Sequence, residues 1–178
     1  MDPVLERDTI LSSLRDAASP LEGRVKSVLI PPQGLSLGYA LRGARDRDGV
    51  AAVNVGTRNG GPVVCGTPAF GTDDPVVPVI LTLMKFDPAI RSAAILRYSE
   101  RALIVLEEDL FLDCAVADTA SQRPGISTMD WGIASCCREG IPALIWKKSG
   151  QPDESRLILT GEGPAGVCSN IIICSNRL

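Results

Sequence analysis

The residues that could do chemistry in this chain are lysines, arginines, cysteines and carboxylates, because the sequence contains no histidine. Without an imidazole, neither a Ser-His-Asp nor a Cys-His catalytic arrangement can form. A serine or cysteine nucleophile would need a lysine or a carboxylate as its base. Lys147 and Lys148 end a predicted strand, where their side chains could reach a pocket or remain solvated. These two lysines are therefore candidates for catalysis or ligand binding.

Two segments have the composition of a phosphate site, in which a loop precedes the N-terminus of a helix. They are Gly161 to Pro164 and Phe70 to Pro75. The free N–H groups and the positive dipole end of such a helix favour anions. Both segments also contain carboxylates, which oppose a phosphate, so an ordinary helix start is the alternative interpretation. In the first segment, Gly161 and Gly163 are the candidate ligand-binding positions.

The six cysteines could suggest a metal site or a disulfide framework. They form no CxxC pair and have no histidine partner, and two of them are adjacent at Cys136 and Cys137. We interpret them as small buried hydrophobic side chains. The sequence also lacks a Walker loop and a G-x-G-x-x-G between a strand and a helix. We therefore expect neither a metal nor an organic cofactor.

The composition is that of a globular protein, with 178 residues, of which 45% are hydrophobic and 22% charged. We expect a single domain over residues 1–178. A net charge of −3 and a pI of about 5.0 argue against nucleic acid as a partner. The N-terminus has no signal-peptide pattern, and no apolar run is long enough to span a bilayer. We therefore expect a cytoplasmic protein with no membrane partner.

The elements that must position these residues alternate between strands and helices in the second half of the chain. Predicted helices cover residues 3–21, 74–84, 87–92, 99–108, 128–138 and 163–174. Predicted strands cover residues 28–30, 37–41, 50–55, 63–66, 93–98, 112–117, 143–147 and 156–160. Asn59-Gly60-Gly61 predicts a hairpin turn. The alternation indicates an α/β layered fold, and the hairpin indicates a mixed sheet.

Seven segments, taken in order, resemble one known family. They are Leu35-Ser-Leu-Gly-Tyr-Ala-Leu-Arg-Gly-Ala-Arg-Asp46, Gly49-Val-Ala-Ala-Val53, Gly66-Thr-Pro-Ala-Phe-Gly71, Phe86-Asp-Pro-Ala-Ile-Arg91, Leu96-Arg-Tyr-Ser-Glu100, Met129-Asp-Trp-Gly132 and Gly161-Glu-Gly-Pro164. At these spacings the chain resembles the archaeal-type thiamine-phosphate synthase domain, the ThiN family, from about Arg7 to Cys174. The resemblance is that of a stand-alone, divergent member.

The resemblance implies a three-layer α/β/α sandwich with a mixed sheet, similar to class II aldolase-like domains. It also implies a transferase reaction, in which hydroxymethylpyrimidine diphosphate and thiazole phosphate give thiamine phosphate and diphosphate. In that reaction a diphosphate leaves and a cationic pyrimidine methylene develops. Arginine or histidine would stabilise the departing charge.

The positions that carry this chemistry in the family differ in this chain. The family's arginine and histidine positions fall on Gly56 and Pro75, although Arg58 could replace the arginine if the turn shifts. A polar asparagine position falls on Ile95, and a Gly-Lys-Glu-Pro loop becomes Pro152-Asp-Glu-Ser155. Losing one charge-stabilising group costs on the order of 10² to 10³ in rate. The scaffold is thus retained while its charged positions are replaced.

We therefore expect a thiamine-pathway protein that resembles the synthase and binds a phosphorylated thiamine or precursor as its small-molecule partner. Guanidinium groups suit phosphate. The candidate ligand contacts with charged side chains are Arg58, Arg91, Arg97, Asp118, Arg123, Asp130, Lys147 and Lys148. Asp118 could bind a pyrimidine amine or cap a turn. Asp130 and Trp131 could form a pocket wall or a helix start.

Two alternatives stay open. An active synthase would use Arg58 as a catalytic residue, with Lys147 or Lys148 covering for the lost groups. A structural or regulatory subunit would have no ligand of its own. Its interface would include Ile171 to Ile173 of the last helix, which core packing also explains. A homo-oligomer is a possible assembly in either case.

Overall fold

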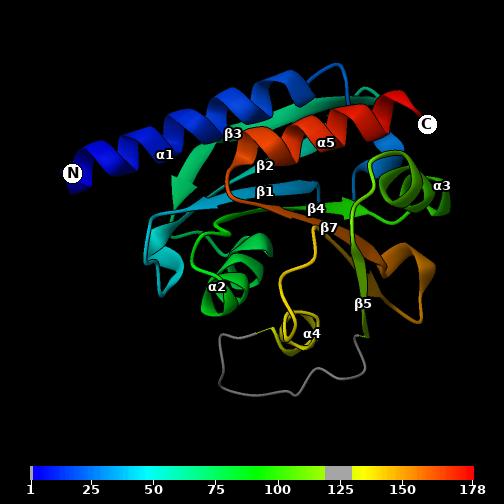
Figure 1. The fold of residues 1–178 in the computed structure, drawn as a ribbon. Helices are drawn as coiled ribbons and strands as arrows, with labels where there is room; N and C mark the ends of the chain where they lie inside the picture. The colour runs from blue at the N-terminus through cyan, green and yellow to red at the C-terminus, as the bar shows by residue number, and fades with distance from the viewer. Residues whose placement is uncertain (1, 119–129) are drawn as a thin grey trace.

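The computed structural model describes residues 2–118 and 130–178, which form a seven-stranded sheet with the strand order β3-β2-β1-β4-β7-β6-β5 (Figure 1). The strands are β1 (Leu35–Ala40), β2 (Val50–Arg58), β3 (Gly61–Phe70), β4 (Ser92–Arg97), β5 (Cys114–Asp118), β6 (Leu144–Lys148) and β7 (Arg156–Gly161). Neighbouring strands are antiparallel, except that β5 and β6 are parallel. The predicted α/β fold with a mixed sheet is therefore confirmed.

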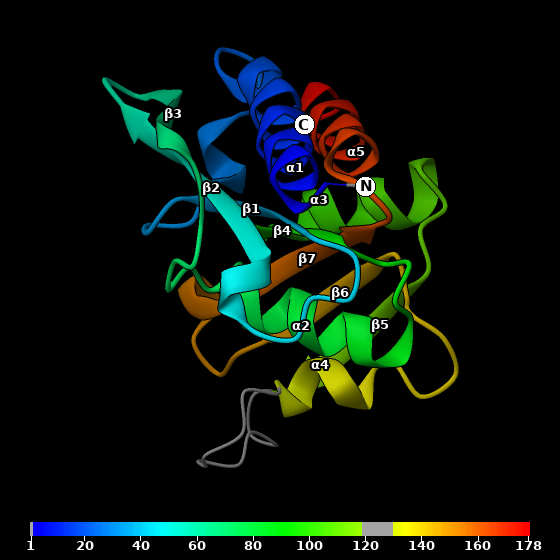
Figure 2. The same cartoon turned by 90° about the vertical axis from the view of Figure 1, so that its left-hand side faces the viewer.

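Helices cover both faces of this sheet and give a three-layer α/β/α arrangement (Figure 2). On one face lie α1 (Pro3–Ala18), α3 (Glu100–Ile104) and α5 (Pro164–Asn176). On the other face lie α2 (Val76–Phe86) and α4 (Trp131–Ser135). Each face has its own hydrophobic core. The sheet is thus buried between two layers of helices.

The side chains of β1 point alternately toward the two layers of helices. Leu35 and Leu37 are fully buried in the core under α1 and α5. Successive strand residues point to opposite faces, so Ser36 and Gly38 face α2. A Cβ at Gly38 would lie 2.6 Å from Cδ1 of Ile80, a residue of α2. The glycine therefore lets this helix pack closely against the sheet.

Helix α2 begins where the sequence predicted. The carboxylate Oδ1 of Asp74 accepts a hydrogen bond from the backbone N–H of Val76 at 2.9 Å. This contact satisfies one of the free N–H groups at the start of the helix. Most of the helix is then apolar and buried against the sheet, beside α4.

The predicted hairpin joins β2 and β3 through Asn59 and Gly60. Both residues have positive φ angles, 53° and 80°. Such angles are required in a two-residue turn whose twist matches the flanking strands. The pairing of Arg58 with Gly61 closes the turn. The hairpin is therefore confirmed, and both strands are longer than predicted.

Three predicted elements differ from the structure. Residues 28–30 are not a strand, because Ser27–Leu29 form a 3-10 turn just before two prolines. Residues 87–92 are not a helix, since Oδ1 of Asp87 accepts from the N–H of Ala89 in a tight turn and Ser92 already begins β4. Helix α4 covers only Trp131–Ser135 of the predicted 128–138. At Asp87, local turn chemistry overrides the helix-start pattern.

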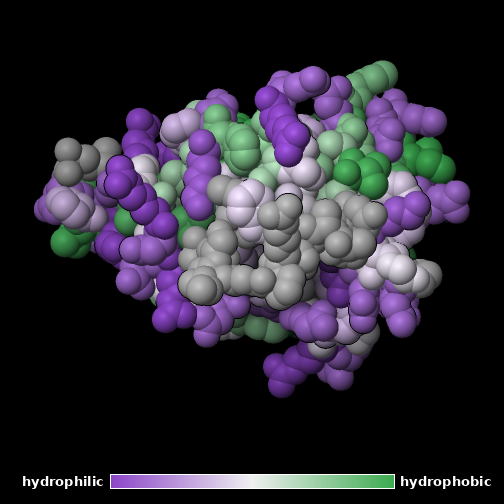
Figure 3. All heavy atoms as spheres, turned by 90° about the horizontal axis from the view of Figure 1, so that it is seen from below, coloured by the Kyte–Doolittle hydropathy of each residue, from purple (hydrophilic) through white to green (hydrophobic). Residues whose placement is uncertain are grey.

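Hydrophilic residues cover most of the face seen in Figure 3, with smaller hydrophobic areas between them. Among residues 2–118 and 130–178, no helix is both long and apolar enough to cross a membrane. On α5, Ile171 is fully buried in the core while Ile173 is 39% exposed. The isoleucine run thus serves core packing through Ile171, and Ile173 faces outward.

Candidate functional site

The residues singled out from the sequence lie at opposite ends of the sheet. Arg91, Gly161 and Gly163 lie at the end where β4 begins and β7 ends. Arg97, Lys147 and Lys148 lie at the other end, where β4 and β6 finish. Arg58 is exposed at the tip of the β2–β3 hairpin. Asp118 ends β5 but its side chain is not described, and Arg123 lies outside the described residues.

A row of three cations crosses the sheet at this second end. Arg156 of β7 lies directly opposite Arg97 of β4 and directly opposite Lys147 of β6. Directly opposed residues point to the same face, which here is the face covered by α2 and α4. We call Arg97, Arg156 and Lys147 the cationic row. Like charges placed in this way repel each other, so the row favours an anion above it.

The two arginines of the cationic row are held by the loop that joins β6 to β7. Nη2 of Arg97 lies 3.2 Å from Oδ1 of Asp153 in an exposed ion pair. Nη1 of Arg156 donates to the carbonyl oxygens of Asp153 at 2.6 Å and Ser155 at 2.9 Å. Burial lowers the pKa of Arg156, and the charge of Arg97 lowers it further. The carboxylates of Glu154 and Asp153 raise this pKa but by less, so an added anion would further stabilise the charged guanidinium of Arg156.

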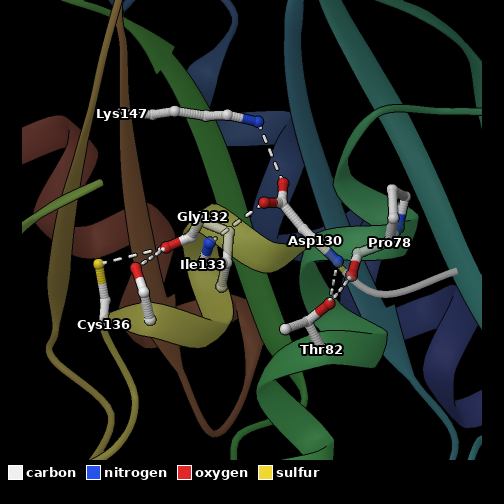
Figure 4. A network of polar contacts seen from close by, with 8 residues as sticks. Pro78, Thr82, Asp130, Gly132, Ile133, Cys136 and Lys147 are labelled. Carbon is white, nitrogen blue, oxygen red and sulfur yellow. Dashed lines mark hydrogen bonds and ion pairs between the residues drawn. The ribbon is translucent and has the colours of Figure 1, made fainter. Parts of the chain in front are cut away.

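Lys147 is fixed by a network that joins β6, α4 and α2 (Figure 4). Its Nζ donates to Oδ2 of Asp130 at 3.0 Å, and the two side chains are 23% and 8% exposed. The other carboxylate oxygen of Asp130 accepts from the N–H of Ile133 and caps α4. The backbone N–H of Asp130 donates to Oγ1 of Thr82, whose hydroxyl donates to the carbonyl of Pro78. Asp130 thus serves as a helix cap and as the partner of Lys147.

Beside the cationic row, the sheet forms the floor of a cavity of about 170 Å³. Ser36 lies directly opposite both Asn54 and Ile95, and Ile95 lies opposite Ile158. All four line the cavity; its other lining residues are Pro31, Gln33, Gly34, Pro75, Val79, Lys147 and Arg156. The floor is polar at β1 and β2, apolar at β4 and β7, and cationic along one side. This combination suits a small ring that carries an anionic group.

Three residues at this cavity were not predicted from the sequence, namely Ser36, Asn54 and Arg156. The signal was present for the first two, since each is a polar residue at an inward position of an otherwise apolar strand. Arg156 would follow from pairing the strands on either side of the 149–155 loop. Lys147 lines the cavity and Asp130 pairs with it, and a role of either residue in ligand binding stays a prediction.

Two of the positions at which the family resemblance implies other residues lie at the same cavity. Pro75 and Ile95 both line it. Gly56 lies two residues beyond Asn54 on β2, on the same face of the sheet. A Cβ at Gly56 would lie 3.1 Å from Sγ of Cys65, so the neighbouring thiol limits the space there.

The hollows at the opposite end of the sheet differ from one another in charge. A hollow of about 850 Å³ at the start of α5 includes Gly161 and Gly163, but Asp16 and Glu162 also line it. Arg91 is engaged within the fold, because its Nε donates to the carbonyl of Ala40 and its guanidinium lies over the Tyr39 ring. The hollow beside α2 includes Asp46, Asp73 and Asp74. Carboxylates thus dominate these two hollows, whereas a third one at this end, of about 510 Å³, is lined by Arg42, Arg91 and Glu162.

Two further candidates lie away from the cavity. Lys148 is exposed and its Nζ lies 5.3 Å from the centre of the Trp146 ring, on the face opposite Lys147. Trp131 is 46% exposed and does not line the cavity beside Lys147. Asp130 and Trp131 therefore form a helix start, in which Asp130 pairs with the cavity-lining Lys147.

The cysteines are free thiols in the structure. Burial raises the pKa of Cys114 and Cys137 to about 11 and that of Cys168 to about 12. Within the described ranges no group of three or more cysteine and acidic side chains is placed to hold a metal ion. Cys137, Cys168 and Cys174 are buried as predicted, Cys114 and Cys136 are half-buried, and the prediction is wrong for Cys65, which is exposed.

The fold and this site define a class of protein, a three-layer α/β domain with a cation-lined cavity at one end of a mixed sheet. Comparison with family models identifies it further. The chain belongs to the thiamine-phosphate synthase ThiN family, whose model matches residues 13–173. The resemblance inferred from the seven segments is confirmed, and the chain is a thiamine-pathway family member.

Known relatives agree with this assignment. The bifunctional thiamine biosynthesis protein ThiDN of Methanocaldococcus jannaschii is 26% identical over 172 residues. The match covers 94% of this chain and 40% of the relative, so the chain spans less than half of that protein.

Solved structures show the same fold. The C-terminal domain of protein MJ0236 superimposes with a TM-score of 0.84 at 23% identity, covering 96% of each chain. The C-terminal domain of phosphomethylpyrimidine kinase superimposes with a TM-score of 0.82 at 22% identity, covering 95% of this chain and 100% of that one.

Proposed function

We propose that this protein binds a phosphorylated ligand of the thiamine pathway in the cavity, with the phosphate against the cationic row. The observation that carries the proposal is the direct opposition of Arg156 to both Arg97 and Lys147. A phosphate or diphosphate would relieve the repulsion among these cations and accept their hydrogen bonds. Family membership supplies the class of ligand.

We further propose that synthase chemistry is weakened in this chain. Gly56 and Pro75 stand where the family resemblance implies an arginine and a histidine, and Pro75 and Ile95 line the cavity. Arg58 is an unsuitable replacement, since it lies four residues beyond Asn54 on β2, roughly 13 Å along the strand. Binding would then persist while the stabilisation of a leaving diphosphate is reduced.

Isothermal titration calorimetry tests the binding proposal with four probes. These are thiamine phosphate, thiamine diphosphate, hydroxymethylpyrimidine diphosphate and thiazole phosphate. We expect at least one probe to bind, and Arg156→Gln to weaken it by about 10-fold or more. Arg101→Gln is the matched control, because Arg101 is exposed on α3. Absence of binding by all four probes, or an equal loss in both variants, would overturn the proposal.

An active synthase is the second candidate, and the ion pair that fixes Lys147 beside the cavity favours it. In that case Lys147 would supply the cation for the departing diphosphate. An assay for thiamine phosphate from the two precursors decides between the candidates. Turnover that Lys147→Met abolishes and Arg58→Ala leaves intact would support the synthase. No turnover would leave the binding function alone.

A further inference from the structure

Two polar side chains lie next to each other on the cavity floor, away from the cationic row. Ser36 of β1 and Asn54 of β2 are directly opposite each other, and both line the cavity. Ser36 is only 4% exposed. Buried polar groups of this kind are costly unless they form hydrogen bonds. Ser36 and Asn54 therefore form a hydrogen-bonding surface at the polar end of the cavity floor.

The orientation of Asn54 is set by a glycine. A Cβ at Gly34 would lie 1.9 Å from Oδ1 of Asn54, so the carboxamide rests directly against the Gly34 backbone. Gly34 has a φ of 96°, a conformation that L side chains rarely adopt. Its N–H donates to the carbonyl of Pro31 at 2.8 Å, which fixes the turn. The loop thus holds the amide in one place beside the cavity.

We infer that Ser36 and Asn54 recognise the aminopyrimidine half of the ligand, an inference that rests on the proposed function. A carboxamide offers a donor next to an acceptor. An aminopyrimidine offers the complement, an exocyclic amine next to a ring nitrogen. A thiazole ring presents a nitrogen acceptor without an adjacent donor. The polar pair therefore selects the pyrimidine half over the thiazole half.

The spacing between the two ends of the cavity agrees with this assignment. Ser36 on β1 is in register with Ile158 on β7, two strands away, and Arg156 lies two residues further along β7, so the backbones of Ser36 and Arg156 are about 12 Å apart. A ring that carries a diphosphate on a methylene group spans such a distance. The cavity of about 170 Å³ is small for a whole two-ring ligand. The Ile95 and Ile158 side chains between the polar pair and the cations would contact the ring.

Calorimetry on Asn54→Leu separates ring recognition from phosphate binding. The probes are hydroxymethylpyrimidine diphosphate, its 4-oxo analogue and inorganic diphosphate. We expect Asn54→Leu to weaken the aminopyrimidine probe by about 10- to 100-fold and to leave inorganic diphosphate unchanged. The wild type should prefer the amino probe over the 4-oxo analogue, and the variant should lose that preference. Asn170→Leu, at the opposite end of the sheet, is the matched control.

The outcomes distinguish this inference from the function on which it rests. Equal weakening of both diphosphates, or no preference for the amino probe in the wild type, overturns the inference alone. Failure of every probe to bind the wild type overturns the proposed function as well. If Asn54→Leu does not fold, Ser36→Ala decides, with an expected loss of about 5- to 10-fold for the amino probe only.

Discussion

Arg156 of β7 lies directly opposite Lys147 of β6, so two cations share one face at the end of the sheet. Opposed like charges destabilise a strand pair. In this structure the cost is offset by Asp130, which pairs with Lys147, and by loop carbonyls that accept from Arg156. The arrangement keeps positive charge beside a cavity while the fold remains stable.

The Lys147–Asp130 pair should show measurable coupling. Lys147→Met leaves the carboxylate of Asp130, which is 8% exposed, without its cation. We expect a loss of about 1 to 3 kcal/mol in the free energy of unfolding. Asp130→Asn keeps an oxygen for capping α4. Urea unfolding of both single variants and the double variant should give a coupling of about 1 to 2 kcal/mol. Additive losses would mean that the pair contributes no stability.

Thr82 should matter because its hydroxyl joins α2 to the start of α4. Thr82→Val keeps the shape but leaves the N–H of Asp130 without its acceptor. We expect the free energy of unfolding to fall by about 1 to 2 kcal/mol, measured in urea. Thr57→Val, at an exposed position of β2, is the control and should change stability by less than about 0.5 kcal/mol. Similar values for the two variants would contradict the role of Thr82.

Gly38 should not tolerate a side chain. In Gly38→Ala the new Cβ would lie 2.6 Å from Cδ1 of Ile80 and 2.8 Å from Cγ1 of Val76. Helix α2 would have to shift, at a cost of about 1 to 3 kcal/mol in thermal or urea unfolding. Gly150→Ala has no atom within 4 Å of its new Cβ and serves as the control. A neutral Gly38→Ala would show that α2 packs less closely than described.

Alkaline pH should destabilise the protein through Cys168. Burial raises the pKa of this thiol from 9.0 to about 12. Above pH 9 the unfolded chain loses the proton first, so stability falls as pH rises. Between pH 8 and 10.5 this amounts to about 2 kcal/mol. Over this pH range the free energy of unfolding of Cys168→Ala should fall by about 2 kcal/mol less than that of the wild type. Parallel pH curves for the two proteins would exclude the effect.

Restoring the charged positions should increase synthase turnover. Gly56→Arg with Pro75→His returns the residue types that the family resemblance implies, one of them at the cavity. Cys65→Ala belongs in the same background, because Sγ of Cys65 would lie 3.1 Å from the new Cβ. We expect turnover to rise by about 10² over the Cys65→Ala parent, measured as thiamine phosphate formed. Unchanged turnover would show that other differences limit the chemistry.

Much of the architecture could be predicted from local patterns. Asp74 before an apolar run indicated the start of α2, and Asn59-Gly60 indicated the hairpin, because capping and positive φ depend on few neighbouring residues. The same local rule failed at Asp87, where a carboxylate closes a turn that leads directly into β4. The predicted helix 128–138 also extended too far at its C-terminal end, since α4 ends at Ser135.

The site was less predictable, because it depends on which strands become neighbours. The sequence indicated Lys147 as a candidate but also suggested Arg91, which the fold uses to cover Tyr39. Ser36 and Asn54 are far from Lys147 in the sequence. Only the strand order β2-β1-β4-β7-β6 brings these three side chains to one cavity.

By itself the sequence determined the α/β class, the mixed sheet and membership of the ThiN family, since these follow from periodicity, turn residues and ordered segments. The tertiary structure alone decided that Arg97, Arg156 and Lys147 form one row and that Ser36 meets Asn54. Strand register fixes which side chains share a face, and register is a property of paired strands rather than of either segment alone.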